Sequence, residues 1–566
     1  MAAGGRGYTA MKLAAPRTLA GALTLVAIFL PIGLIVYQSL LSGAFFEPRS
    51  ELGFSAFRFI LSDPGFWKAL GNSMLMGISM LVIAVPLGSF FAFLLVRTDT
   101  PGRKYMEPFM LAPMLTSPVV LAFGYLIAAG PVGFYSIWTR QLIGTVPWNI
   151  YSPISIAIIG GLIHVPHVYI YTSTALKNLA SDIEEAARIS GASPLRVAWD
   201  VSLPMIRPAL IFSSVLVFLA GVETFGLVLI LGNRMDFDTL AVYLYKLTNR
   251  LGVPSYQLMA AVAVVMLGLT IPLVTVQRFL LRGENRFASL KGKGARQRPV
   301  QLGSFRWVAF AIVCLWAIVT VVVPLSGVTL RAFVTSWGQG VDLISSLTLE
   351  NFRIVFSEPS MLRAIKNSIL IGVIGGALSV ACYVVIALVL HRKHDGLSRS
   401  VDFSLMLPRA LPGVAAGLAF FWAFLFFWPL TEFRTTLFSV WLAYTVVWLP
   451  YGVKLVQTAL IQVSSELEEA ARSVGAKPWQ VIFDVSLPLV RFGILSSWVL
   501  VFIAFEREYA TGVYLLNTGT EVVGAMLVSL ADGGSINMVA ALSVINITLV
   551  CAGMAVALRF GIKLHD

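Results

Sequence analysis

Two polar stretches repeat the same residue types at the same spacing in a chain that is otherwise strongly apolar. The first is Glu184-Glu185-Ala186-Ala187-Arg188, followed by Gly191 and by Ser202-Leu203-Pro204. The second is Glu468-Glu469-Ala470-Ala471-Arg472, followed by Gly475 and by Ser486-Leu487-Pro488. The small alanines would let a partner surface approach closely, and each glycine lets the backbone reverse sharply. These residue types at this spacing are suited to binding a partner.

Each stretch has the pattern of two short helices joined by a turn. In the first copy Asp182, Glu184 and Glu185 fall in the opening turn, where carboxylates favour the positive end of the helix dipole. Gly191 then ends the first helix, and a second runs on to Pro204. Ordinary amphipathic helices lying on a membrane surface are the competing interpretation. Surface location does not require a fixed spacing in two copies, so we favour docking.

Ionisable residues also occur inside apolar runs, where they are costly and usually face a cavity or a partner. They are Glu223 and the triplet Glu506-Arg507-Glu508. Two interpretations stay open: local ion pairs or interhelical hydrogen bonds, or a lining of the translocation path. No His or Cys accompanies them at metal-ligand spacing, so we predict no metal site. His164 and His167 flank Pro166 and are predicted to pack or to hydrogen-bond.

Composition places this chain in a membrane. Of its 566 residues 58% are hydrophobic and only 12% are charged, and the mean hydropathy is +0.84. A soluble domain is nearer half apolar and a quarter charged. In a soluble protein the formal charge of +13 would suggest binding to nucleic acid, but in this chain the basic residues are concentrated in particular loops. Cys314, Cys382 and Cys551 lie in apolar runs and show no disulfide or metal pattern.

Apolar runs long enough to cross about 30 Å of hydrocarbon as helices occur twelve times. They lie near 17–41, 72–96, 106–129, 152–175, 208–232, 257–281, 307–329, 367–390, 403–428, 437–459, 492–516 and 537–558. Prolines break the third and the ninth run. We therefore predict an all-α polytopic membrane protein of about twelve helices.

Basic residues mark one side of the predicted membrane protein. They follow the second and eighth spans as Arg97, Arg103, Lys104, Arg392, Lys393 and Arg399, and they crowd the segment between spans six and seven. The segment 517–536, after the eleventh span, has none. By the positive-inside rule both chain termini are predicted to be cytoplasmic.

The two halves of the chain are repeats. A shift of 284 residues maps the first polar stretch onto the second, whereas Asn72-Ser73 matches Asn367-Ser368 at a shift of 295. The first half therefore holds eleven extra residues, which we place near 130–151. Six spans per half give parallel repeats related by a pseudo-two-fold axis along the membrane normal. The predicted units are residues 1–281, a cytoplasmic linker over 282–306, and residues 307–566, with the polar loops at about 180–204 and 464–488.

Here the sequence resembles a known family. Glu185-Ala186-Ala187, Gly191 and Val201-Ser202-Leu203-Pro204 are similar to the Glu-Ala-Ala loop of binding-protein-dependent ABC importer permeases, and Glu469-Ala470-Ala471, Gly475 and Val485-Ser486-Leu487-Pro488 match it again. The family usually has Ile where this chain has Val201 and Val485. A fused pair of this length is most similar to the ferric-iron group, whose relatives include thiamine, phosphonate and polyamine permeases.

The resemblance implies a mechanism. The loop would be a coupling helix seated on a separate ATPase homodimer, which binds ATP and Mg²⁺ and rocks the halves between inward- and outward-facing states. Contacts to that ATPase are assigned to Glu185, Ala186, Ala187, Gly191, Glu469, Ala470, Ala471 and Gly475. A periplasmic or lipid-anchored binding protein would deliver substrate, with ferric iron the first choice. The chain has no Gly-x-x-x-x-Gly-Lys-Ser/Thr phosphate loop, so it is predicted to be a permease of the bacterial inner membrane that binds no cofactor and is no enzyme.

Two other classes compete with this interpretation. A secondary active transporter also has twelve spans in two parallel repeats, but it gives no reason for the duplicated loops. A membrane enzyme would show His or carboxylate clusters at a membrane surface, and the sequence shows none.

Overall fold

The computed structural model describes residues 4–47, 50–179, 181–248, 254–280, 299–392, 395–405, 407–408 and 411–559. These residues form helices and no named strand; isolated bridges such as Leu41 with Leu52 are the sole β pairings among them. The linker predicted over 282–306 falls outside the described residues as far as residue 298.

In the part of the first half that the structure describes there are sixteen named helical elements. They are α1 (Gly4–Ser39), α2 (Ser55–Ser62), α3 (Pro64–Arg97), α4 (Arg103–Leu115), α5 (Pro118–Ala129), α6 (Phe134–Ile143), α7 (Pro153–Asn178), α8 (Ser181–Ile189), α9 (Pro194–Val197), the π-helix η1 (Ala198–Ser202), α10 (Leu203–Met205), α11 (Arg207–Val222), α12 (Gly226–Leu231), the 3₁₀-helix η2 (Asn233–Met235), α13 (Leu240–Lys246) and α14 (Tyr256–Leu280).

The second half repeats this order. Its elements are α15 (Phe305–Ala317), the π-helix η4 (Ile318–Val322), α16 (Val323–Ala332), α17 (Glu350–Ser357), α18 (Pro359–Leu370), the π-helix η5 (Ile371–Gly375), α19 (Gly376–Leu390), α20 (Gly396–Ser404), α21 (Gly413–Phe426), the 3₁₀-helix η7 (Thr431–Phe433), α22 (Leu437–Ile461), α23 (Ser465–Ser473), α24 (Pro478–Gln480), the π-helix η8 (Val481–Ser486), α25 (Leu487–Leu489), α26 (Arg491–Arg507), the 3₁₀-helix η9 (Val513–Leu515), α27 (Val523–Asp532) and α28 (Ile536–Arg559).

Proline opens several of the long helices, because its missing N–H is not needed in the first turn. It stands first in α3, α5, α7 and α18. Polar caps assist: Asp63 accepts a 2.9 Å hydrogen bond from the Gly65 N–H, and Ser152 accepts one of 3.2 Å from Ser155. The helix starts thus follow from the local sequence.

The described residues contain nine helices long and apolar enough to cross a membrane, or eleven if two bent pairs each count as one span. The twelve predicted runs correspond to these nine helices, the two bent pairs and the shorter apolar helix α21. The chain is therefore an all-α polytopic membrane protein, as predicted. The prolines of the third and ninth runs separate α4 from α5 and make α21 begin only at Gly413.

The change of register between the halves has a structural cause. The starts of α5 and α21 are 295 residues apart, whereas those of α7 and α22 are 284 apart. The eleven extra residues thus fall between α5 and α7, where α6 is inserted, which confirms their predicted place near 130–151.

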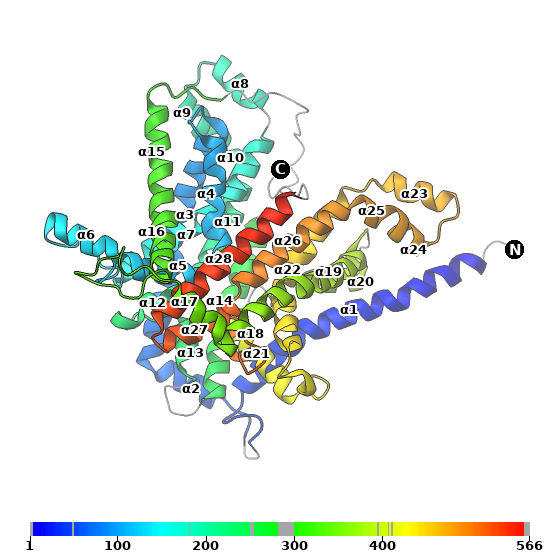
Figure 1. Ribbon diagram of the computed structural model, residues 1–566. Helices are drawn as coiled ribbons and strands as arrows, with labels where there is room; N and C mark the ends of the chain where they lie inside the picture. The colour runs from blue at the N-terminus through cyan, green and yellow to red at the C-terminus, as the bar shows by residue number, and fades with distance from the viewer. Residues whose placement is uncertain are drawn as a thin grey trace.

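The two halves exchange their first helices. The α1 helix packs against α19, α20 and α21 of the second half, and Arg17 forms a 2.6 Å ion pair with Asp395. In return α16 packs on α5, where Gly124 and Gly327 let the two backbones approach closely. Figure 1 shows α15 and α16 standing beside the helices of the first half. The main buried cluster accordingly draws side chains from both halves, among them Phe91, Tyr243, Trp422 and Leu527.

Candidate functional site

The two repeated polar loops have the same conformation and exposure. In α8, Glu185 and Ala186 are exposed and Ala187 is half-buried; in α23 the same holds for Glu469, Ala470 and Ala471. Both loops lie toward the upper side of Figure 1, and α13 and α27 lie toward the lower side. The parallel repeats thus present both motifs on one side of the molecule.

A glycine turns the backbone after each motif helix. Gly191 has φ +88° and Gly475 has φ +91°, both in the left-handed region where a side chain causes strain. The N–H of the next residue bonds back to the motif: Ala192 donates to the Ala187 carbonyl and Ala476 to the Ala471 carbonyl, each at 3.0 Å. The turn predicted at these glycines is confirmed.

Each loop then runs into a bent span. The stretch Ala198–Met205 meets Arg207–Val222 at 66°, and Pro478–Leu489 meets Arg491–Arg507 at 70°. A π-helix, η1 or η8, precedes each bend and ends at Ser202 or Ser486. The following Leu-Pro places a residue without an N–H at the start of the next turn, and such breaks in the helical bonding commonly mark functional positions. The loop and the fifth span of each half are therefore one bent unit.

The glutamate before each assigned motif is buried, unlike its neighbour. The side chain of Glu184 is 9% exposed and lies 3.3 Å from the Arg97 guanidinium at the end of α3. Ser202 donates a 2.7 Å hydrogen bond to the same carboxylate. A buried charge is tolerated when it is paired and hydrogen-bonded, as here.

Glu468 occupies the equivalent place in the second half. Its side chain is 3% exposed, Arg392 pairs with it at 2.9 Å, and Ser486 donates a 3.1 Å hydrogen bond to it. His391 at 3.1 Å and Arg472 at 3.6 Å are further partners. The sequence analysis named Glu184 and Glu468 as part of the repeated stretches but did not identify them as functional residues. The signal was present, because Arg97 and Arg392 correspond at the 295-residue shift and the glutamates and serines at the 284-residue shift.

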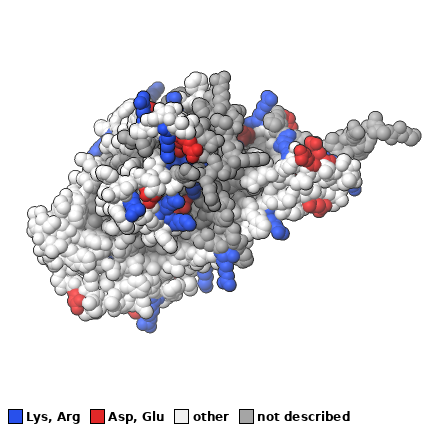
Figure 2. Space-filling view, turned by 90° about the horizontal axis from the view of Figure 1, so that it is seen from above, with Lys and Arg blue, Asp and Glu red and all other residues white. Residues whose placement is uncertain are grey.

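Large apolar side chains are exposed on the surface of both loops. Ile189 is 88% exposed and Trp199 70%, while in the second loop Val474 is 86% and Phe483 62% exposed. Trp199 and Phe483 are equivalent at the 284-residue shift. Figure 2, which looks at the molecule from above relative to Figure 1, shows charged side chains gathered in patches on this side and a broad flank without them. Apolar residues rimmed by charge are typical of a surface that binds another protein.

A cavity of about 310 Å³ lies where the two halves meet. Equivalent positions of both halves line it: His164 corresponds to Trp448, and His167 to Tyr451. His164 Nδ1 is 2.8 Å from the Gly160 carbonyl oxygen, consistent with the predicted hydrogen bonding of this histidine. That both histidines face a cavity was not predicted from the sequence.

Of the four charged residues predicted for the translocation path, two line this cavity. Glu223 follows the last residue of α11, and Glu508 follows the last residue of α26. Trp448 donates a 3.1 Å hydrogen bond to the Glu508 carboxylate, and the Thr511 N–H donates one of 3.0 Å. The predicted spans 208–232 and 492–516 are thus interrupted at these carboxylates, because both helices end there.

The other two charged residues lie beside the cavity without lining it. The Arg507 Nε donates a 3.2 Å hydrogen bond to the Thr116 carbonyl of the first half. The Glu506 side chain is buried against Gly372, and within the described part of the chain its carboxylate has no hydrogen-bond partner. No three His, Cys, Asp or Glu side chains in that part come together as a metal site requires.

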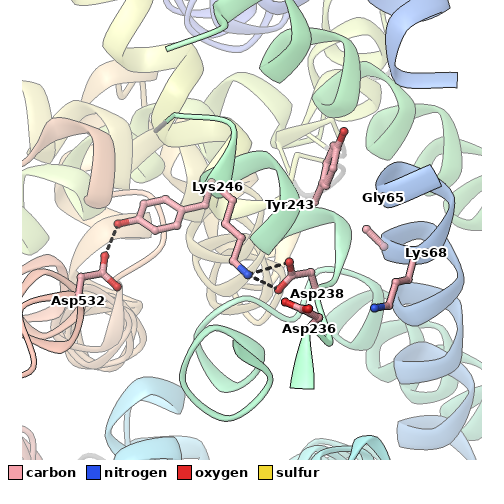
Figure 3. Close-up of a pocket in the computed structure, with 9 residues that line it drawn as sticks. Gly65, Lys68, Asp236, Asp238, Tyr243, Lys246 and Asp532 are labelled. Atoms are coloured by element: carbon pink, nitrogen blue, oxygen red, sulfur yellow. Dashed lines mark hydrogen bonds and ion pairs between the residues drawn. The ribbon is translucent and has the colours of Figure 1, made fainter. Parts of the chain in front are cut away.

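A second cavity of about 530 Å³ lies beside α13, toward the side of the molecule away from the polar loops. Figure 3 shows Lys246 between α13 and the aspartates, 2.8 Å from Asp238, with Lys68 of α3 pointing toward them. Tyr245 donates a 2.7 Å hydrogen bond to Asp532 and so connects α13 to α27 of the second half. The first repeat therefore contributes charged and phenolic side chains to this cavity, and the second repeat contributes the Asp532 carboxylate.

Comparison with known proteins gives a family match and two similar curated proteins. Residues 84–285 and 383–562 match the family described as the binding-protein-dependent transport system inner membrane component. A putative ferric transport system permease protein of Haemophilus influenzae is 23% identical over 82% of this chain and 72% of its own length. A molybdenum transport system permease protein of Escherichia coli K12 is 27% identical over 32% of this chain and 77% of its own length.

Among solved structures, a bacterial ABC transporter that imports the acidic polysaccharide alginate aligns with a TM-score of 0.39 and 17% identity. The alignment covers 48% of this chain and 95% of that one.

Proposed function

Because the chain belongs to the binding-protein-dependent transport system inner membrane components, with two matched copies, we propose that it is a two-lobed permease of an ATP-driven importer. The observation that carries this proposal is the duplicated loop. Each copy exposes its Glu-Ala-Ala motif on one side of the molecule and continues directly into the fifth span of its own half. Such a loop transmits force from a docked partner to a span.

The partner that fits these loops is a separate ATPase with two equivalent docking grooves. Glu185, Ala186, Ala187 and Gly191, with Glu469, Ala470, Ala471 and Gly475, are the proposed contacts. The exposed apolar side chains Ile189, Trp199, Val474 and Phe483 add the buried area that a stable interface needs. ATP and Mg²⁺ would be bound by the ATPase homodimer, so that one copy of this chain serves both of its subunits.

The translocation path is proposed to pass between the halves. The cavity lined by His164, His167, Glu223 and Glu508 draws on both repeats, so a rocking motion of the halves would open it alternately to the two sides. Glu506 and Arg507 lie next to it in the last turn of α26 and are proposed to act at its gate. Carboxylates and imidazoles in this position favour cations and hydrogen-bonding substrates.

The opposite side is proposed to receive a periplasmic or lipid-anchored binding protein. The charge bias of the loops supports a cytoplasmic position for the polar loops and both termini, in a chain proposed to lie in a bacterial inner membrane. The cavity of Figure 3 would then face the periplasm, where charges from both halves, such as Lys68 and Asp532, can contact a protein seated across them.

Ferric iron is the proposed substrate. The similarity to a ferric transport permease over most of the chain supports it, as does the presence of carboxylates in the cavity. Thiamine, phosphonate and polyamine remain alternatives, and the similarity to a molybdenum permease adds an oxyanion to them.

The proposal is tested by reconstituting the chain in liposomes with candidate ATPase and binding-protein partners from the same organism. Uptake of radiolabelled ferric iron should require ATP on the side of the membrane where the ATPase is bound. It should also require the binding protein on the opposite side. Competition by unlabelled thiamine, polyamine, phosphonate or molybdate identifies a different substrate. Uptake that persists without ATPase would instead identify a secondary active transporter.

A further inference from the structure

Each buried glutamate of the polar loops sits at a junction of four segments. In the first half, Arg97 at the end of α3 reaches Glu184 of α8 at 3.3 Å and the carbonyl of Leu179, just after α7, at 3.5 Å. Ser202 of η1 adds the fourth segment through its 2.7 Å bond to the carboxylate. One carboxylate and one guanidinium thus join the ends of the second and fourth spans, the motif helix and the entry to the fifth span.

The second half builds the same junction. Arg392, just after α19, contacts Glu468 at 2.9 Å and donates a 2.8 Å hydrogen bond to the Val463 carbonyl. Ser486 of η8 closes the junction at 3.1 Å. All four members of the junction have equivalents in the other half. The arginines correspond at the 295-residue shift, and the glutamates, the serines and the residues that supply the carbonyl correspond at the 284-residue shift.

The buried glutamates of the junctions differ in exposure from the glutamates of the Glu-Ala-Ala motifs. Glu185 and Glu469 face solvent, where a partner can reach them, whereas the adjacent Glu184 and Glu468 face inward. Opening a junction would leave a buried guanidinium or carboxylate without its partner, which is strongly unfavourable. Arg392 even holds the left-handed φ of 53°, a conformation that a non-glycine residue keeps only when its surroundings fix it. The four segments are therefore expected to move together.

We propose that Glu184 and Glu468, with Arg97, Arg392, Ser202 and Ser486, are positioning residues that make each half a rigid lever. A push on the exposed face of the motif helix is passed through the junction to the second, fourth and fifth spans at once. This inference rests on the proposed ATP-driven function. It assigns to the buried glutamates the transmission of the movement, and leaves partner docking to their exposed neighbours.

The test is coupling in the reconstituted complex. Glu184→Gln and Glu468→Gln keep the side-chain shape and remove the charge, so the ATPase should still bind and hydrolyse ATP. Substrate taken up per ATP hydrolysed should fall about tenfold, the size of a typical coupling free energy between two sites. Asp402→Asn, which breaks the exposed 2.9 Å pair with Lys454, is the matched control and should leave this ratio unchanged.

Milder variants guard against misfolding. Ser202→Ala and Ser486→Ala remove one hydrogen bond from the carboxylate and leave the ion pair in place, and should lower the ratio about threefold. An unchanged ratio in both serine variants and in every glutamine variant that inserts into the membrane overturns the inference. If the unmodified complex shows no ATP-dependent uptake, the proposed function itself has failed, which is a separate result.

Discussion

The imidazole rings of His164 and His167 stack with their centroids 5.1 Å apart in the wall of the cavity between the two halves. Their equivalents Trp448 and Tyr451 pack with centroids 5.4 Å apart in the facing repeat. Both halves therefore have two adjacent aromatic rings at these equivalent positions, but the rings differ in chemical type. One wall of the cavity is imidazole and the other is indole and phenol, so a passing substrate meets two unlike surfaces.

Removing the cavity carboxylates should slow transport. Glu223→Gln and Glu508→Gln each preserve side-chain shape but remove a negative charge that draws a cation into the cavity. In Glu508→Gln the amide oxygen can still accept from either Trp448 or Thr511, although not from both. We expect uptake of ferric iron to fall about tenfold at equal expression, in line with electrostatic steering by charges in a cleft. Glu432→Gln, at an exposed site in η7, is the control. Full uptake by both cavity variants would remove these carboxylates from the path.

The two junctions should differ in their tolerance of arginine loss. Arg97→Ala leaves Glu184 with Ser202 alone among the contacts described here, and breaking this buried pair should destabilise the protein by about 3 kcal/mol. Arg392→Ala leaves His391 and Arg472 beside Glu468. Because the Arg392 side chain is one-third exposed, its loss should cost only about 1 kcal/mol.

Thermal unfolding of the purified variants in detergent measures this difference. The double variant Arg97→Ala/Glu184→Ala should recover part of the stability lost in Arg97→Ala, since it no longer buries an unpaired carboxylate. Equal destabilisation by Arg97→Ala and Arg392→Ala would show that the additional partners of Glu468 contribute nothing.

The exposed aromatic residues of the loops should matter for binding and hardly for folding. Trp199→Ser and Phe483→Ser should each weaken ATPase binding about thirtyfold, as expected of aromatic residues central to an interface. Their effect on stability should stay within about 0.5 kcal/mol, since both side chains are exposed. Trp428→Ser, at an exposed position beyond α21, is the control; equal binding by all three variants would refute a docking role.

The two loop glycines should tolerate asparagine better than alanine. A Cβ at Gly191 or Gly475 meets no atom within 4 Å, so the sole penalty comes from the positive φ. Alanine should therefore cost about 1 kcal/mol of loop stability, and asparagine less, because it adopts the left-handed region more readily. Affinity for the ATPase, measured by titration, should follow the order Gly, Asn, Ala. An Ala variant that binds as tightly as the unmodified chain would show that the turn is not needed.

Sequence alone predicted the repeat, the spans and the turns at Gly191 and Gly475, because these depend on hydropathy and local backbone preference. It assigned the motif to Glu185 and Glu469 and passed over their neighbours. Whether a glutamate is buried depends on Arg97 or Arg392, which lie far upstream and come close only when the helices pack. The cavity likewise forms only when both halves pack together. The sequence around His164 and His167 therefore could not show that these residues line it.

The central claim, that both loops dock on an ATPase, is tested most directly by site-specific crosslinking. Cysteines placed at Ile189 and Val474, in a chain whose three native cysteines have been replaced, stand at well-exposed positions of the two loops. In native membranes a bifunctional thiol reagent should join both positions to the companion ATPase, and ATP should change the yield at both together. Labelling of either position by a membrane-impermeant reagent from the periplasmic side, without any crosslink to the ATPase, would contradict the account.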